Sequence, residues 1–255
     1  MKGYMIDLDG TMFHGKKLVE GAKEWVDTLI EKDVPFIFLT NNSARTPEQA
    51  AQHMLDMGFE HIEPKHFYTS AMAAVSYVSH HYSDRKAFYI GELGLHDALV
   101  RNGFTIVNGT DELADFVFIG LNREANYTMY SEAVKHLVHG AVLVGTNNDR
   151  ILLSEKGVNV GNGSIVAMFE HVCGRESIKI GKPHQPILDE ALKFMNMKKE
   201  DVIVVGDNLE TDIALGEKFG VETILVLTGI HKESDIERLG IYPTYVVDKM
   251  SNWNM

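Results

Sequence analysis

Short apolar runs alternate with amphipathic helix patterns at both ends of this 255-residue chain, and this alternation restricts the fold more than any other feature. Runs that are apolar throughout are typical of strands covered on both faces. Strands that alternate with helices predict a parallel sheet with helices on both sides. The strands predicted in this way are residues 3–8, 34–39, 202–205, 223–227 and, more weakly, 244–247.

The middle of the chain has strands and helices of its own. Three apolar runs there end in glycine, over residues 88–91, 116–120 and 142–145. The stretch is long enough to form a separate domain. We therefore expect an α/β fold with a discontinuous core formed by residues 1–75 and 179–255, and an inserted α/β domain over residues 76–178.

Charge and composition exclude several classes of partner. The formal net charge is −12, which argues against binding to nucleic acid or to an anionic membrane, because both need clustered Lys and Arg. A small phosphate ester is not excluded, since a metal ion can reverse the local field. The single cysteine forms no intramolecular disulfide, and no segment approaches the ~20 apolar residues of a membrane span. We expect a cytoplasmic protein, and its oligomeric state stays open, a homodimer included.

Two carboxylates, Asp7 and Asp9, follow the first predicted strand. In an extended chain, residues two apart point to the same side, so both can address one ligand. Their mutual repulsion is relieved by a hard divalent cation with oxygen ligands. A calcium-binding loop needs glycine and an acid where this chain has Met12 and Leu18, so that motif fails. Two solvated acids in a turn stay an alternative.

Three further polar segments follow other strands or precede a helix. Thr40 and Asn41 end the second strand, where a hydroxyl and backbone N–H groups suit phosphate oxygens. Lys182 stands between glycine and proline as a point charge, and Asp207 and Asp212 follow a late strand. Each has an ordinary alternative: a polar turn, a surface lysine, or a helix cap at Asp212. On a regular helix the two late acids would lie about 140° apart, so they share a ligand only if part of the segment is a loop.

Together these residues make a complete set for phosphoryl transfer, and ligands of open α/β sheets bind beyond the carboxyl ends of the strands. The four segments, in this order, resemble the motifs of the haloacid dehalogenase-like hydrolase superfamily, and specifically its NagD-type sugar or nucleotide phosphatases. The resemblance implies a Rossmann-like core and a large α/β cap. The segments that carry it are Asp7-Leu8-Asp9-Gly10-Thr11, Thr40-Asn41-Asn42-Ser43, Gly181-Lys182-Pro183 and Gly206-Asp207-Asn208-Leu209-Glu210-Thr211-Asp212, with support from residues 223–229.

The resemblance also implies roles for the residues that touch the phosphate. Asp7 would be the nucleophile, and Asp9 would protonate the leaving oxygen and later activate water. Thr40 and the Asn41 backbone would bind the phosphoryl oxygens. Lys182 would neutralise the charge shared by the nucleophile and the phosphate. The predicted function is hydrolysis of small phosphate monoesters, such as sugar phosphates or nucleoside monophosphates, through an aspartyl-phosphate.

The implied cofactor is Mg²⁺. Its ligands would be the side chains of Asp7 and Asp207 and the backbone carbonyl of Asp9. Asn208 and Asp212 would support these ligands without binding the metal themselves. The partner predicted for this site is a small phosphorylated metabolite.

Other functions on the same fold stay open. A dehalogenase would have no use for the acid at Asp9, whereas a phosphomutase or a non-catalytic sensor of phosphorylated metabolites remains an alternative. The glycine-rich loop at 160–164 lacks the full dinucleotide-binding pattern. Choice of substrate is expected in the cap, where we predict recognition of the leaving group by Asn147, Asn148 and Asp149, with an ordinary polar turn as the alternative.

Overall fold

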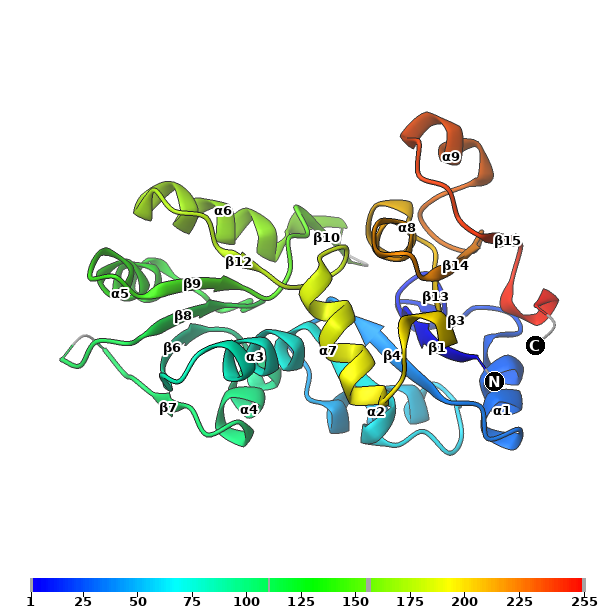
Figure 1. The fold of residues 1–255 in the computed structure, drawn as a ribbon, viewed down its shortest axis with the longest axis horizontal. Helices are drawn as coiled ribbons and strands as arrows, with labels where there is room; N and C mark the ends of the chain where they lie inside the picture. The colour runs from blue at the N-terminus through cyan, green and yellow to red at the C-terminus, as the bar shows by residue number, and fades with distance from the viewer. Residues whose placement is uncertain (1, 110, 155–156, 254–255) are drawn as a thin grey trace. The chain divides into compact units, whose positions relative to one another are not determined.

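The computed structural model describes residues 2–109, 111–154 and 157–253, and the chain separates into two compact units. The first unit comprises residues 1–40, 47–68 and 182–255, and the second comprises 41–46 and 69–181. Both units are built from a parallel sheet with helices, which confirms the predicted α/β class (Figure 1).

The first unit contains a six-stranded sheet with the order β15-β14-β13-β1-β4-β5. Its elements are β1 (Gly3–Ile6), β2 (Phe13–His14), β3 (Lys17–Leu18), α1 (Ala22–Glu31), β4 (Phe36–Thr40), α2 (Pro47–Asp56), η1 (Pro64–His66), β5 (Phe67–Thr69), α7 (Gln185–Met195), η2 (Lys199–Asp201), β13 (Val202–Gly206), η3 (Leu209–Ile213), α8 (Ala214–Phe219), β14 (Glu222–Val226), α9 (Glu233–Leu239), β15 (Tyr245–Val247) and η4 (Met250–Asn252).

Strands β1, β4, β13 and β14 are buried on both faces, as their continuous apolar runs require, whereas the edge strand β15 is exposed. Alternate residues of β1, β4, β13 and β14 join the buried stripes of α1 and α2 in one core. Helix α7 packs on β4, and α8 packs on β13 and β14. The parallel pairing places Ile6 beside Val205 on one side and beside Phe38 on the other. The residues that follow these three strands therefore emerge at one edge of the sheet.

The second unit contains a five-stranded parallel sheet with the order β12-β9-β8-β6-β7 and a separate two-stranded hairpin, β10-β11. One core packs β6, β8 and β9 against α5 and α6. Its elements are α3 (Ser70–His81), β6 (Lys86–Ile90), α4 (Leu93–Arg101), β7 (Thr105–Ile106), β8 (Phe116–Ile119), α5 (Tyr127–Val138), β9 (Val142–Gly145), β10 (Ile151–Ser154), β11 (Gly157–Val160), α6 (Asn162–Cys173) and β12 (Ile178–Lys179).

The unit boundaries differ from those expected in the sequence. The predicted boundary after residue 75 falls inside α3, and all of this helix belongs to the second unit. Its buried residues are spread over more than two turns, so the helix cannot be divided between two cores. The short segment 41–46 also belongs to the second unit, which no local pattern indicated. Over the parts of the chain that are described, no helix has the length and apolar character that a membrane span needs.

Candidate active site

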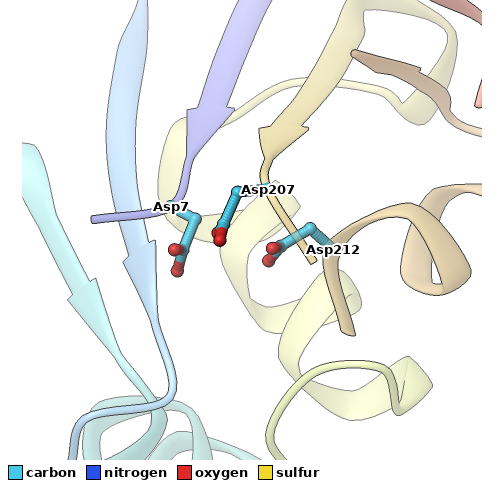
Figure 2. A group of neighbouring side chains, drawn as sticks. All are labelled: Asp7, Asp207 and Asp212. Carbon is cyan, nitrogen blue, oxygen red and sulfur yellow. The ribbon is translucent and has the colours of Figure 1, made fainter. Parts of the chain in front are cut away.

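Asp7 and Asp207 leave neighbouring parallel strands at the same edge of the first unit's sheet. Asp7 follows β1 and Asp207 follows β13, and the Asp7 amide donates to the Val205 carbonyl at 2.8 Å. Figure 2 shows both carboxylates beyond the arrowheads of their strands. The sheet order thus brings together two acids that are 200 positions apart in the chain, as predicted from their places after buried strands.

Asp212 reaches the same place through a wide helical turn. Residues Leu209–Ile213 form a single π-helical turn, and a π-turn spaces side chains differently from a regular helix. One carboxylate oxygen of Asp212 accepts the Asn208 amide at 3.2 Å, which folds the segment back toward β13. Ligand atoms of Asp7, Asp207 and Asp212 all lie within 4.8 Å of one another (Figure 2). Asn208 contributes by capping this turn, because its side-chain oxygen accepts the Glu210 amide at 2.9 Å.

Lys182 supplies the cation next to these acids. Its ammonium donates to Asp7 Oδ1 at 2.6 Å, to Asp212 Oδ1 at 2.7 Å and to the Leu39 carbonyl at 2.8 Å. The side chain is only 3% exposed, so it is no surface lysine. Three acceptors match the three donors of an ammonium group, which fixes its position.

The Asp207 carboxylate is held mainly by a backbone amide. The Ile230 amide donates to Asp207 Oδ2 at 2.7 Å, and the Thr11 hydroxyl lies 3.5 Å from Oδ1. A Cβ atom at Gly229 would lie 1.8 Å from Oδ2, and one at Gly10 would lie 2.3 Å from it. Only glycine permits these close approaches.

Burial and mutual repulsion shape the electrostatics of the cluster. Burial raises the pKa of Asp7 from 3.8 to about 7, even though Lys182 favours the charged form. Burial, with a contribution from Asp7, raises the pKa of Asp207 to about 6. Burial would lower the pKa of Lys182, but the charges of Asp212 and Asp7 outweigh it and raise this pKa. Three carboxylates with one ammonium leave an excess of negative charge, and an oxygen-only donor set of this kind suits a hard divalent cation such as Mg²⁺.

Asp9 and Thr40 lie at the same edge of the sheet. Asp9 is exposed, and its backbone forms a bridge with Phe13 in the turn after β1. Thr40 is buried and is the last residue of β4, the neighbour of β1 on the side opposite β13. Their roles toward a phosphate stay predictions.

The remaining predicted residues lie in the second unit. The Asn41 amide group donates to both oxygens of Asp149, at 3.0 and 3.3 Å, and the Asn147 amide group donates to the Asn41 carbonyl at 2.8 Å. Asn148 lines a groove of about 340 Å³ together with Arg150, Ser164, Glu170, Lys179 and three small or apolar residues. The loop therefore sends alternate side chains to two different places within its unit.

One segment that holds the site was not among the predicted site residues, although residues 223–229 supported the family resemblance. Residues 228–231 follow β14 and contribute the Ile230 amide, while the Thr228 hydroxyl donates to the Gly10 carbonyl at 2.8 Å. The His231 ring accepts the Leu209 amide at 3.1 Å. The available signal was the same as for the other motifs: a polar residue and a glycine directly after a buried strand.

A buried lysine among carboxylates at the carboxyl ends of adjacent parallel strands places the chain among α/β proteins whose charged groups gather at the ligand-binding edge of the sheet. Comparisons with known proteins agree. A family model described as haloacid dehalogenase-like hydrolase matches residues 4–105, and one described as HAD-hydrolase-like matches residues 179–253. The chain belongs to the haloacid dehalogenase-like hydrolases, which confirms the resemblance found in the sequence.

Individual relatives match over nearly the whole chain. The 5'-nucleotidase YutF of Bacillus subtilis is 36% identical over 256 residues, which are 99% of this chain and 97% of that protein. The structure of NagD from E. coli K-12 has a TM-score of 0.91 and 32% identity, and the match covers 100% and 98% of the two chains. A glycerol phosphate phosphatase from Mycobacterium tuberculosis, solved with magnesium, has a TM-score of 0.90 and 28% identity, over 98% of this chain and 75% of that one.

Proposed function

We propose that the chain is a magnesium-dependent phosphatase that hydrolyses small phosphate monoesters through an aspartyl-phosphate on Asp7. The observation that carries this proposal is the cluster of Asp7, Asp207 and Asp212 around the ammonium of Lys182. The relatives support it, since one is named a 5'-nucleotidase and another is a glycerol phosphate phosphatase solved with magnesium. Sugar phosphates and nucleoside monophosphates are the proposed substrates, and the second unit is the proposed seat of substrate choice.

The residues divide the reaction into two steps. In the first, a carboxylate oxygen of Asp7 attacks phosphorus, the ester P–O bond breaks, and Asp9 gives a proton to the departing oxygen. In the second, Asp9 takes a proton from water, the water oxygen attacks phosphorus, and the bond between phosphorus and Asp7 breaks to release phosphate. Two easier steps replace one difficult hydrolysis, and transfer of a proton to the leaving oxygen typically contributes 10²–10⁴-fold.

Positive charge is needed because a carboxylate and a phosphate dianion repel each other. Lys182 lies 2.6 Å from Asp7 Oδ1 and would offset part of this repulsion. Asp7 and Asp207 would hold Mg²⁺ through their side chains. When bound, the ion supplies charge that stabilises the phosphoryl oxygens. Asp212 would keep Lys182 in place, since its carboxylate accepts the ammonium at 2.7 Å. The hydroxyl of Thr40 and the backbone of Asn41 would bind the phosphoryl oxygens.

The test is hydrolysis of p-nitrophenyl phosphate by the purified protein, with Mg²⁺, with a chelator, and with the Asp7→Asn variant. We expect release that depends on Mg²⁺ and that falls by at least ~10³-fold in the variant, because the amide is no nucleophile. Asp201→Asn is the matched control, since it removes an exposed carboxylate of the same unit. Circular dichroism should show that both variants are folded.

Other results would favour the alternatives on the same fold. A folded protein that binds inorganic phosphate with Mg²⁺ but turns over no ester would be a sensor. Transfer of the phosphoryl group to a second position of a sugar, without release of phosphate, would indicate a mutase. Either result contradicts the proposal.

A further inference from the structure

At two places where the chain passes from one unit to the other, it passes through a residue of the proposed phosphate site. The first unit ends at Thr40 and the second begins at Asn41; the second unit ends at Gly181 and the first resumes at Lys182. Asn41 and Gly181 are thus the second unit's covalent neighbours of Thr40 and Lys182. The bonds that hold Asn41 and Gly181 within the second unit therefore affect how Thr40 and Lys182 are placed.

Asn41 is held at both its carbonyl and its side chain. The carbonyl accepts the Asn147 amide group at 2.8 Å and the Ser70 hydroxyl at 2.7 Å. The side-chain amide donates to Asp149 at 3.0 and 3.3 Å. A residue bound at its backbone and at its side chain keeps one orientation, because each bond excludes a different rotation.

Gly181 is held by the same loop. Its amide donates to the Thr146 carbonyl at 2.9 Å. A Cβ atom at this position would lie 2.7 Å from the side-chain oxygen of Asn41 and 2.8 Å from both the Thr146 carbonyl and Asn147 Cβ. Asn41 and Gly181 therefore both contact one loop, residues 146–149, which we call the junction loop.

The junction loop is itself well anchored. Thr146 and Asn147 are buried, and the buried Asn162 amide group donates to the Thr146 hydroxyl at 3.2 Å and to the Asn147 carbonyl at 3.3 Å. The Asn147 side-chain oxygen accepts the Asp149 amide at 3.1 Å. The Asn147 side chain and the backbone of Asp149 are thus held by bonds within the loop, and the start of α6 adds a bond from the Gly163 amide to the Asp149 carbonyl at 2.9 Å.

We infer that Asn147 and Asp149 are positioning residues, which orient Asn41 for binding of the phosphoryl group. This inference rests on the proposed function. The sequence predicted instead that they recognise the leaving group, but their side chains are bonded to Asn41. Asn148, between them, lines a groove that neither Asn147 nor Asp149 lines. A residue that orients the phosphate site affects every substrate equally, because all substrates share the phosphoryl group.

The experiment measures kcat and KM on p-nitrophenyl phosphate, glucose 6-phosphate and AMP for the wild type, Asp149→Ala and Asp149→Asn. We expect Asp149→Ala to lower kcat/KM by about 10–100-fold on each substrate, since misplacement of about 1 Å can cost 10²-fold. Ratios between substrates should stay the same. Asp149→Asn should recover most of the loss, because its amide oxygen still accepts the Asn41 amide.

Asp111→Ala is the matched control, because it makes the same substitution at an exposed acid of the second unit. If Asp149→Ala does not fold, Asn147→Ala serves as the second variant, with the same uniform loss expected. A change of more than about tenfold in the ratios between substrates, with p-nitrophenyl phosphate unaffected, would overturn the inference in favour of leaving-group recognition. Full activity of Asp149→Ala, or no recovery in Asp149→Asn, would also overturn it.

Failure of the proposed function would be seen separately, as an inactive wild type. In that case calorimetric binding of inorganic phosphate in the presence of Mg²⁺ replaces turnover. Weaker binding to Asp149→Ala than to Asp149→Asn and the wild type would uphold the positioning role without catalysis. Equal binding to all three proteins would contradict it.

Discussion

Three glycines lie so close to the carboxylates of the acid cluster that none of them could carry a side chain. A Cβ atom at Gly206 would lie 2.2 Å from the Asp212 carboxyl carbon, and Cβ atoms at Gly229 and Gly10 would lie 1.8 and 2.3 Å from Asp207 Oδ2. Without side chains, these residues let main-chain groups approach the carboxylates closely, as the Ile230 amide does at 2.7 Å. Groups that orient metal ligands typically contribute about 10–100-fold to metal affinity.

At this scale we predict that Gly229→Ala weakens magnesium binding. The added methyl group would push the Asp207 carboxylate away from its place, and disturbed support of a metal ligand typically costs 10–100-fold in affinity. The Mg²⁺ concentration for half-maximal hydrolysis should rise by about that factor, measured by titrating Mg²⁺ against p-nitrophenyl phosphate turnover. Gly58→Ala adds a Cβ that meets no atom within 4 Å, but at a φ of +94°, so it should lower stability while leaving this concentration unchanged. If the Mg²⁺ concentration for half-maximal hydrolysis were the same in Gly229→Ala as in the wild type, the prediction would be contradicted.

At the scale of elements, the turn that carries Asp212 depends on acceptors outside itself. The first amides of a helix have no partner within the helix. In η3, the Leu209 amide donates to the His231 ring at 3.1 Å, and the Glu210 amide donates to the Asn208 side chain at 2.9 Å. Leu209 and His231 are both buried, so water does not readily replace this bond.

We therefore predict that His231→Leu destabilises the protein by about 1–3 kcal/mol, the usual cost of an unpaired buried amide. His231→Asn should be destabilised less, because its side-chain oxygen can accept the Leu209 amide. The free energy of unfolding from denaturant titration, in the presence of Mg²⁺, measures both. Equal values for the two variants would show that the ring contributes only by packing.

At the scale of the whole molecule, the acid cluster links stability to pH and to metal. In the folded state the pKa of Asp7 is about 7 and that of Asp207 is about 6, against 3.8 for a free aspartate. Between these values the folded protein holds protons that the unfolded chain has released. The cluster's contribution to stability is therefore greatest below about pH 4 and is lost as pH rises through 6 and 7.

The corresponding prediction compares melting temperatures with a chelator and with Mg²⁺ between pH 5 and 8. With the chelator, the cluster lowers the melting temperature as pH rises. Mg²⁺ binds the charged carboxylates, so it should raise the melting temperature by several degrees at pH 8 and by little at pH 5. Groups outside the site titrate in the same way in both series, so they do not contribute to the difference in melting temperature at a given pH. A difference that is constant with pH would contradict the prediction.

The α/β class, five strands of the first unit's sheet and the three longest strands of the second could be predicted from the sequence, together with the polar residues that follow several of them. Strands β5, β7 and β12 and the two hairpins were not predicted. Asp7, Thr40 and Asp207 were found because each directly follows a buried apolar run, and burial on both faces of a strand leaves a pattern within a few residues. The acidic pair also predicted a cation, since like charges at close range need one. These inferences depend only on neighbours in the chain.

Which side chains bind one another depends on how distant segments of the chain pack. Asn41 and Asp149 are 108 positions apart, and Lys182 and Asp7 are 175 apart. Such pairs depend on the order and register of the strands, which a local pattern does not encode. The contribution of Asp212 likewise depended on a π-turn that helical periodicity did not predict. Strand ends are visible in the sequence because a strand buried on both faces leaves a continuous apolar run, whereas partners at a site are set by contacts between distant segments.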